Sequence, residues 1–103
     1  MTAIRLDPQF QLDPTQRLRS PGDVLRDDYM LPAAMTATEL ARRTGLPLRQ
    51  VRRVIHGEPI DAECAIRFAA VFRTTALYWM VLQVEFDMAR ERRRHLPGGL
   101  GVR

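Results

Sequence analysis

The chain has 103 residues, of which 46% are hydrophobic and 27% charged, so it can bury one compact core as a single domain. It carries a net charge of +4, and all 16 of its basic residues are arginine. The single cysteine, Cys64, excludes an internal disulfide, and no apolar run is long enough to span a membrane. The first residues lack the apolar stretch of a secretory signal, so we expect a cytoplasmic protein.

The positive charge is concentrated in two short blocks of sequence. Residues 36–57 and 89–103 each carry five arginines against one glutamate, whereas acidic residues predominate in 1–35 and 58–88. A GC-rich coding sequence explains the absence of lysine at least as well as function does. The placement of the arginines is more informative, because their planar guanidinium groups bind phosphates and guanine edges in a bidentate way.

The N-terminal part of the chain predicts an arm followed by a short helix. In residues 1–20 the apolar residues are too sparse for a core element, which predicts a flexible arm. Pro21-Gly22 is expected to break the chain there. Val24, Leu25 and Tyr29 then have helical spacing, and Pro32 ends this short helix.

The central block predicts two helices joined by a tight turn. Thr36 and Glu39 have the spacing of a capping box, in which each side chain binds the other's backbone amide. The helix that they begin should run to about Thr44, where Gly45 supplies a left-handed stop. After Leu46-Pro47 a second helix should run over 48–55 and end near His56-Gly57. This is the pattern of a helix-turn-helix motif.

Two further helices complete the predicted domain. Asp61 should cap a helix that ends at about Phe72, and Thr74-Thr75 should cap a long last helix that ends in the arginine run 90–94. The fold class is therefore all-α, with five helices. We expect an arm over 1–20, a domain over 21–90 and a disordered, basic, glycine-rich tail over 91–103.

The helix over 48–55 has two chemically different faces. At about 100° per residue, one face collects Leu48, Val51, Val54 and Ile55, and the opposite face collects Arg49, Arg52, Arg53 and His56. Gln50 lies between them and is included among the expected DNA contacts. A solvated arginine face on an ordinary surface helix is the simpler interpretation, but no acidic residue neutralises this face and a capped helix and glycine turn precede it. We therefore expect this face to enter the major groove of DNA, with Thr36 and Thr38 of the preceding helix near phosphates.

Neither catalysis nor metal binding is indicated. His56, His95 and Cys64 are too few and too far apart in sequence for a zinc site, and the carboxylates show no nucleophile pattern. Cys64 is expected to be a small buried side chain, and Tyr78 and Trp79 are expected in the core or an interface. We predict no cofactor and no enzyme activity.

Four runs of sequence resemble the HigA-like antitoxins of the XRE family, whose fold is that of the phage lambda repressor and Cro. They are Ser20–Tyr29 (SPGDVLRDDY), Glu39–Pro47 (ELARRTGLP), Ala65–Ala69 (AIRFA) and Thr74–Gln83 (TTALYWMVLQ) followed by Phe86-Asp87. The resemblance covers about residues 20–90. The chain departs from the pattern where Ser20 and His56 replace a histidine and an asparagine, where Arg73 replaces a glycine, and in the shorter loop over 56–61.

The resemblance implies the antitoxin of a type II toxin–antitoxin system. Such a protein would bind a near-palindromic operator as a homodimer, repress transcription of its own operon and neutralise a HigB-like messenger-RNA endonuclease. A stand-alone transcriptional regulator without a toxin is the alternative, and an adaptor that no longer binds DNA is a third hypothesis.

Two sets of contact residues follow from these expectations. The long last helix is the expected dimerisation element, through some of its large side chains: Tyr78, Trp79, Leu82 and Phe86. An RNA-binding toxin must be basic, so its inhibitor gains from acidic and apolar contacts. We expect these contacts in the first 30 residues, at Leu6, Phe10, Leu12, Asp23 and Asp27. The acidic stretch with Glu58, Asp61 and Glu63 is the second candidate, and the arm is alternatively a leader without a role.

Overall fold

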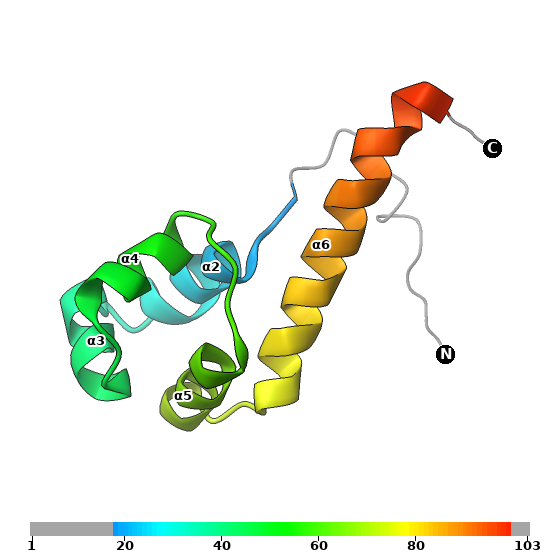
Figure 1. Cartoon of the computed structure of the whole chain (residues 1–103). Helices are drawn as coiled ribbons and strands as arrows, with labels where there is room; N and C mark the ends of the chain where they lie inside the picture. The colour runs from blue at the N-terminus through cyan, green and yellow to red at the C-terminus, as the bar shows by residue number, and fades with distance from the viewer. Residues whose placement is uncertain (1–17, 100–103) are drawn as a thin grey trace. The chain divides into compact units, whose positions relative to one another are not determined.

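The computed structural model describes residues 18–99, and its regular elements there are all helices (Figure 1). In chain order they are α2 (Pro21–Val24) continuing into η2 (Leu25–Met30), α3 (Ala37–Thr44), α4 (Leu48–Ile55), α5 (Ala62–Phe72) and α6 (Ala76–Gly99). With α2 and η2 counted as one helix, these described residues form five helices. The predicted all-α class and helix count are confirmed.

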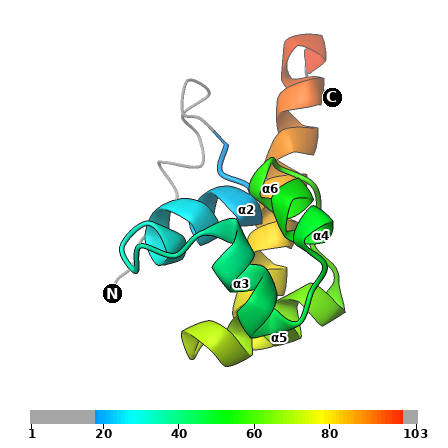
Figure 2. The same ribbon diagram turned by 90° about the vertical axis from the view of Figure 1, so that its left-hand side faces the viewer.

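The chain divides into two units, which are described separately. One unit spans Arg19–Phe86 and contains α2, η2, α3, α4, α5 and the first part of α6. The other includes α6 from Asp87 onward. Within the first unit α3 packs against both α4 and α5, and α2 packs against α4 (Figure 2).

The first helix starts earlier than the sequence predicts. The Asp23 amide donates to the Ser20 hydroxyl at 3.1 Å, and the Ser20 amide donates to the Asp23 carboxylate at 2.9 Å. Pro21 therefore occupies the first turn of α2, where the missing N–H costs nothing, and the expectation that Pro21-Gly22 breaks the chain is wrong. Tertiary packing then requires glycine at position 22, because a Cβ there would lie 1.8 Å from the Val54 carbonyl oxygen of α4.

Helix α3 begins and ends where the sequence predicts, but its capping box is only half formed. The Glu39 amide donates to the Thr36 hydroxyl at 3.1 Å. The Glu39 carboxylate accepts instead from Arg42 at 2.6 Å and from Arg43 at 2.7 Å. These two guanidinium groups lower the pKa of Glu39. Gly45 ends the helix in the left-handed region, with φ of 77°.

Helix α5 shows a predicted cap at each end. The Cys64 amide donates to the Asp61 carboxylate at 2.9 Å, which lowers the pKa of Asp61. At the other end Arg73 adopts φ of 59°, so an L-residue occupies the left-handed position where the resembled family has glycine. Thr75 then caps α6 by accepting the Tyr78 amide at 3.0 Å.

The core of the first unit is centred on Trp79, whose exposed fraction is 0%. Its ring contacts Phe68 with centroids 5.4 Å apart, and its indole N–H donates to the Thr74 hydroxyl at 2.7 Å. Trp79 is thus a core residue, which is one of the two places expected for it, and in a single copy its side chain has no exposed surface for a partner. Tyr78 lies at the edge of this cluster. Its hydroxyl is 3.2 Å from the Tyr29 hydroxyl, and desolvation raises the pKa of Tyr78 to about 12.

In the second unit α6 continues to Gly99, so the expected end of the helix in the arginine run 90–94 is wrong. Ion pairs one helical turn apart support this part: Arg90 with Asp87 at 3.4 Å, Arg94 with Glu91 at 3.1 Å, and His95 with Glu91 at 2.7 Å. The longer helix was not predicted because the arginines were interpreted as a tail. Arg90 and Arg94 each lie three positions from an acidic residue, which is a spacing of ion pairs along a helix.

Candidate nucleic-acid interface

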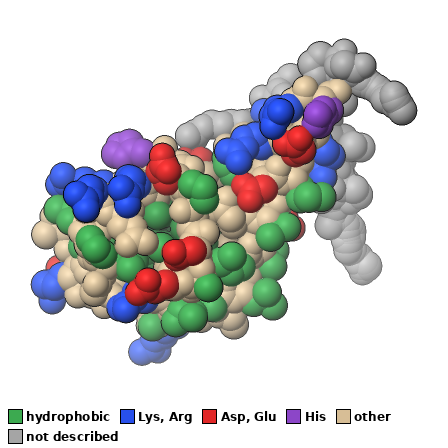
Figure 3. Space-filling model, in the orientation of Figure 1, with side chains coloured by type: hydrophobic (Ala, Val, Ile, Leu, Met, Phe, Trp, Pro, Cys, Tyr) green, Lys and Arg blue, Asp and Glu red, His purple; other side chains and the backbone are tan. Residues whose placement is uncertain are grey.

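Helix α4 presents the two faces that its sequence predicts. Val51 and Val54 are buried, and Leu48 and Ile55 are partly buried on the same side. Arg49, Arg52 and Arg53 are exposed on the other side, which Figure 3 shows as a cluster of basic side chains beside a histidine. The core therefore holds one side of this helix and leaves the arginines in solvent.

The three arginines of α4 differ from the other arginines near them. Within residues 18–99 none of the three has an ion pair, whereas Arg42 and Arg43 share Glu39 and Arg67 pairs with Glu63 at 3.0 Å. An unpaired guanidinium keeps its full charge and all its N–H donors for a ligand. The positive potential of this surface therefore comes mainly from α4.

A shallow groove runs along the arginine face. Its lining residues are Leu48, Arg49, Arg52, Arg53, His56 and Glu58. Glu58 is exposed, and its amide donates to the Arg53 carbonyl at 2.9 Å, which holds the loop after α4 close to the helix. In the sequence Glu58 falls in an acidic stretch that is separate from the arginine block. The short loop over 56–61 was the signal that could have placed it beside the arginines.

His56 ends α4 and lies in this groove. Its backbone amide donates to the carbonyls of Arg52 and Arg53, and its ring Nδ1 lies 2.7 Å from the Arg52 carbonyl oxygen. The ring is exposed. The predicted grouping of His56 with the three arginines is thus present in the structure.

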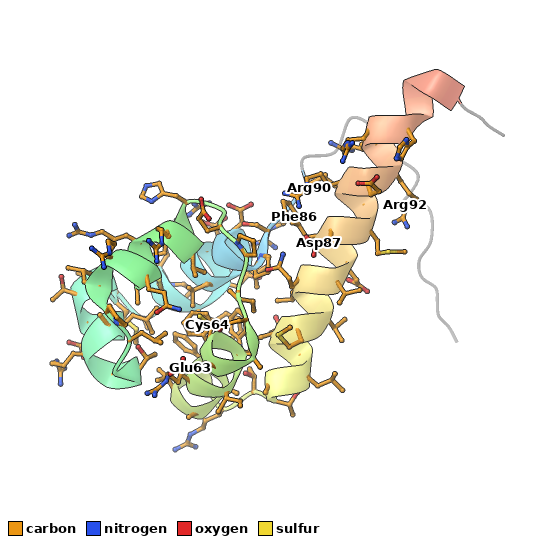
Figure 4. The ribbon with its side chains drawn as sticks, in the orientation of Figure 1. Glu63, Cys64, Phe86, Asp87, Arg90 and Arg92 are labelled. Carbon is orange, nitrogen blue, oxygen red and sulfur yellow. The ribbon has the colours of Figure 1, made fainter. Side chains whose placement is uncertain are left out.

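Gln50 does not lie with the arginines. Its side-chain amide is half-buried and donates to the Cys64 sulfur at 3.2 Å, which joins α4 to α5. Figure 4 shows Cys64 on α5 among the inner side chains, and burial raises the pKa of its thiol. In this structure Gln50 therefore helps to position the helix. A contact between Gln50 and DNA would require its side chain to turn outward, and this contact stays a prediction.

Thr36 and Thr38 are both exposed at the start of α3. The Thr36 hydroxyl oxygen accepts the Glu39 amide, which leaves its O–H free to donate to a phosphate. Neither threonine lines the groove on α4. Their phosphate contacts stay predictions.

The expected dimerisation residues on α6 lie mostly inward. Tyr78, Leu82 and Phe86 are half-buried. In the part of α6 that belongs to the first unit, the large apolar side chains that face solvent are instead Leu77 at 71%, Val81 at 42% and Val84 at 55% exposure. They are spaced four and three residues apart, so they form one stripe on the helix. We call these three residues the α6 stripe. The sequence could not separate it from the buried face, because apolar residues occur on both.

The expected toxin-binding residues have different positions. Leu6, Phe10 and Leu12 lie outside the described residues. Asp23 is only 8% exposed and its carboxylate caps α2, which leaves little of its side chain for a partner. Asp27 is more accessible, and it pairs with Arg26 at 2.8 Å.

No other kind of site is evident in the part of the chain that the structure describes. Residues 18–99 contain no group of three or more histidine, cysteine, aspartate or glutamate side chains placed to hold a metal ion. None of the helices described there is both long and apolar enough to cross a membrane.

Comparison with known proteins places these features in a family, although no family model matches the chain. YbaQ, an HTH-type transcriptional regulator of Escherichia coli K12, is 32% identical over 75 residues, which are 72% of this chain and 66% of YbaQ, slightly less than two thirds of its length. Antitoxin HigA of Pseudomonas aeruginosa, solved with the higBA promoter, is 29% identical with a TM-score of 0.74, over 80% of this chain and 90% of that one.

A second Pseudomonas aeruginosa protein, solved in complex with its operator DNA, has a similar relationship to this chain. It is 31% identical with a TM-score of 0.70, and the match covers 74% of this chain and 83% of that one. Each of these two structural matches covers 74% or more of this chain. The chain belongs to the family of helix-turn-helix regulators that includes the HigA antitoxins.

Proposed function

We propose that this protein is an antitoxin that binds operator DNA as a homodimer, represses its own operon and neutralises a HigB-like messenger-RNA endonuclease. The observation that carries the DNA-binding part is the row of three exposed arginines on α4, none of which has an ion pair within the described residues. The activity is binding rather than catalysis. Operator DNA lies in the bacterial cytoplasm, which is where we expect the protein to act.

The arginine face has the dimensions and chemistry of a major-groove reader. Helix α4 has eight residues, and a major groove about 12 Å wide admits a helix of this kind. Arginine binds guanine O6 and N7 in a bidentate way, and flanking arginines bind phosphates. Two related proteins of this fold were solved with promoter or operator DNA, which supports the same use here.

A homodimer follows from the small size of this reading surface. One helix covers only a few base pairs, so specificity requires two copies on a near-palindromic site, with the two α4 helices about 34 Å apart. The α6 stripe supports this proposal, because Leu77, Val81 and Val84 are apolar and face solvent in one copy. It replaces the half-buried Tyr78 and Leu82 as the main expected contact.

Substitution of the α4 arginines tests the DNA-binding proposal. Arg49→Ala, Arg52→Ala and Arg53→Ala should each weaken binding to a duplex from the upstream region of the gene. A base-reading arginine should cost about 1–3 kcal/mol and relax one operator position, whereas a phosphate contact should weaken all sequences alike. Arg73→Ala is the matched control, because it removes an exposed arginine from the αL turn after α5. Unchanged affinity in the triple alanine variant would show that α4 is not the reading helix.

A stand-alone regulator is the second candidate function. It is favoured by the similarity to YbaQ, which is named as a transcriptional regulator and not as an antitoxin. Co-expression with the product of the adjacent reading frame separates the two. A tagged copy of this protein that retains a small basic neighbour, and restores growth that the neighbour alone arrests, supports the antitoxin. Operator binding without any such partner supports the regulator.

A further inference from the structure

The ring of His56 is held in one tautomer when it is neutral. Its Nδ1 lies 2.7 Å from the Arg52 carbonyl oxygen. A carbonyl oxygen has only lone pairs, so Nδ1 must carry a hydrogen and donate it. In the neutral ring the second nitrogen, Nε2, then has no hydrogen and can only accept.

This arrangement matters because of the ligand that the groove is proposed to hold. A phosphate oxygen is also an acceptor, so neutral His56 offers it no hydrogen bond and places two lone pairs against each other. Protonation adds a hydrogen at Nε2 and a positive charge, and it leaves the bond from Nδ1 to Arg52 in place. The ring therefore becomes a phosphate donor only in its charged form.

Protonation of the His56 ring depends on the charges near it, and a bound phosphate would change their balance. On α4, Arg49, Arg52 and Arg53 line the same groove and oppose protonation, while Glu58 from the following loop favours it. Of the helices that pack on α4, α2 carries Asp23 and Arg26, which pair with each other at 3.3 Å, and α3 carries Glu39, which pairs with Arg42 and Arg43. A phosphate in the groove would outweigh the arginines by neutralising them, and the carbonyl end of α4 also favours a cation.

We propose that DNA binding by this protein takes up a proton at His56, so that affinity for DNA rises as the pH falls through the range where histidine titrates. The inference rests on the proposed binding of DNA by α4. It adds a regulatory property to that site, since a drop in intracellular pH would tighten repression. His56 is the one histidine among the lining residues of the groove, and histidine is the side chain type whose charge ordinarily changes near neutral pH.

The experiment measures the dissociation constant of the full-length protein for a labelled duplex of its own upstream region, at fixed salt, from about pH 6 to pH 8. Affinity should rise towards the acid end by up to about tenfold per pH unit, which is the limit when binding takes up one proton. In His56→Asn the dependence should disappear, because an amide donates an N–H at every pH. His95→Asn is the matched control and should keep the full dependence, since His95 pairs with Glu91 in the other unit of the chain.

The outcomes separate this inference from the proposed function. Salt-sensitive binding that does not change with pH, or a pH dependence that His56→Asn retains, overturns the role of His56 and leaves DNA binding intact. A pH dependence that His95→Asn abolishes also overturns it. The absence of any binding to the duplex overturns the proposed function, and the inference with it.

Discussion

Ala34 and Arg73 have a left-handed backbone although neither is glycine, with φ of 53° and 59°. Arg73 ends α5, and Ala34 lies in the turn before α3. An L-residue in this region brings its Cβ close to the following carbonyl oxygen, which costs about 1–2 kcal/mol. The protein accepts this strain at the two turns that fix how α3 and α5 are connected to their neighbours.

Arg73→Gly should stabilise the protein. Glycine removes the Cβ clash, and its greater freedom in the unfolded chain offsets part of the gain, so we expect about 0.5–1 kcal/mol in the free energy of unfolding. Chemical denaturation at pH 7 measures it. Arg73→Ala keeps a Cβ and serves as control, with little change expected. Equal stability of the glycine and alanine variants would show that the backbone at this turn is not strained.

At the scale of elements, α4 and α6 use their faces in different ways. Helix α4 is short and has one buried and one charged face, so its outer side is fixed as soon as its inner side packs. Helix α6 is long, and it buries Trp79 and Gln83 on one side while the α6 stripe faces solvent on another. The buried Gln83 accepts the Ile60 amide at 2.9 Å, which anchors that side of α6 to the loop before α5.

The α6 stripe should form the dimer interface. Leu77→Ser combined with Val81→Ser should shift the protein from dimer to monomer at micromolar concentration, as measured by sedimentation, because it removes exposed apolar surface that only a partner can bury. The thermal midpoint of the monomer should change little, since neither side chain belongs to the core. Leu31→Ser is the matched control, because Leu31 is equally exposed but lies in the turn before α3. A variant that stays dimeric would place the interface elsewhere.

At the scale of the whole molecule, the two proposed partners require surfaces of opposite character. DNA requires the arginine face of α4, and an RNA-binding toxin, itself basic, is repelled by that face. In the compact unit Arg19–Phe86, Asp23 caps a helix and is therefore a poor candidate for the expected acidic contact with the toxin. The proposed toxin contacts therefore rest on Asp27 and on the arm that contains Leu6, Phe10 and Leu12.

Deletion of residues 1–18 tests whether the arm is the inhibitory element. The compact unit begins at Arg19, so we expect the shortened protein to fold and to bind operator DNA with its normal affinity. Neutralisation of the toxin should be lost, as measured by growth rescue in co-expression. Full rescue by the shortened protein, with operator binding also intact, would show that the arm is a leader without this role.

The sequence alone determined the helix-turn-helix and the arginine face, because both depend on local signals. Thr36, Gly45 and Asp61 fix helix ends through bonds to backbone groups within a few residues, and the position of a side chain around a helix follows from its spacing.

Only the tertiary structure decided which apolar side chain meets which neighbour. Pro21 can break a chain or begin a helix, and packing of Gly22 on Val54 selects the second. Trp79 and Leu77 are both large and apolar on α6, but only Trp79 meets Phe68 of α5, so one became core and the other surface. Gln50 lies between the two faces of α4, and its side chain donates to Cys64, which is fourteen positions later in sequence. These outcomes depend on contacts between residues distant in sequence, about which local spacing carries no information.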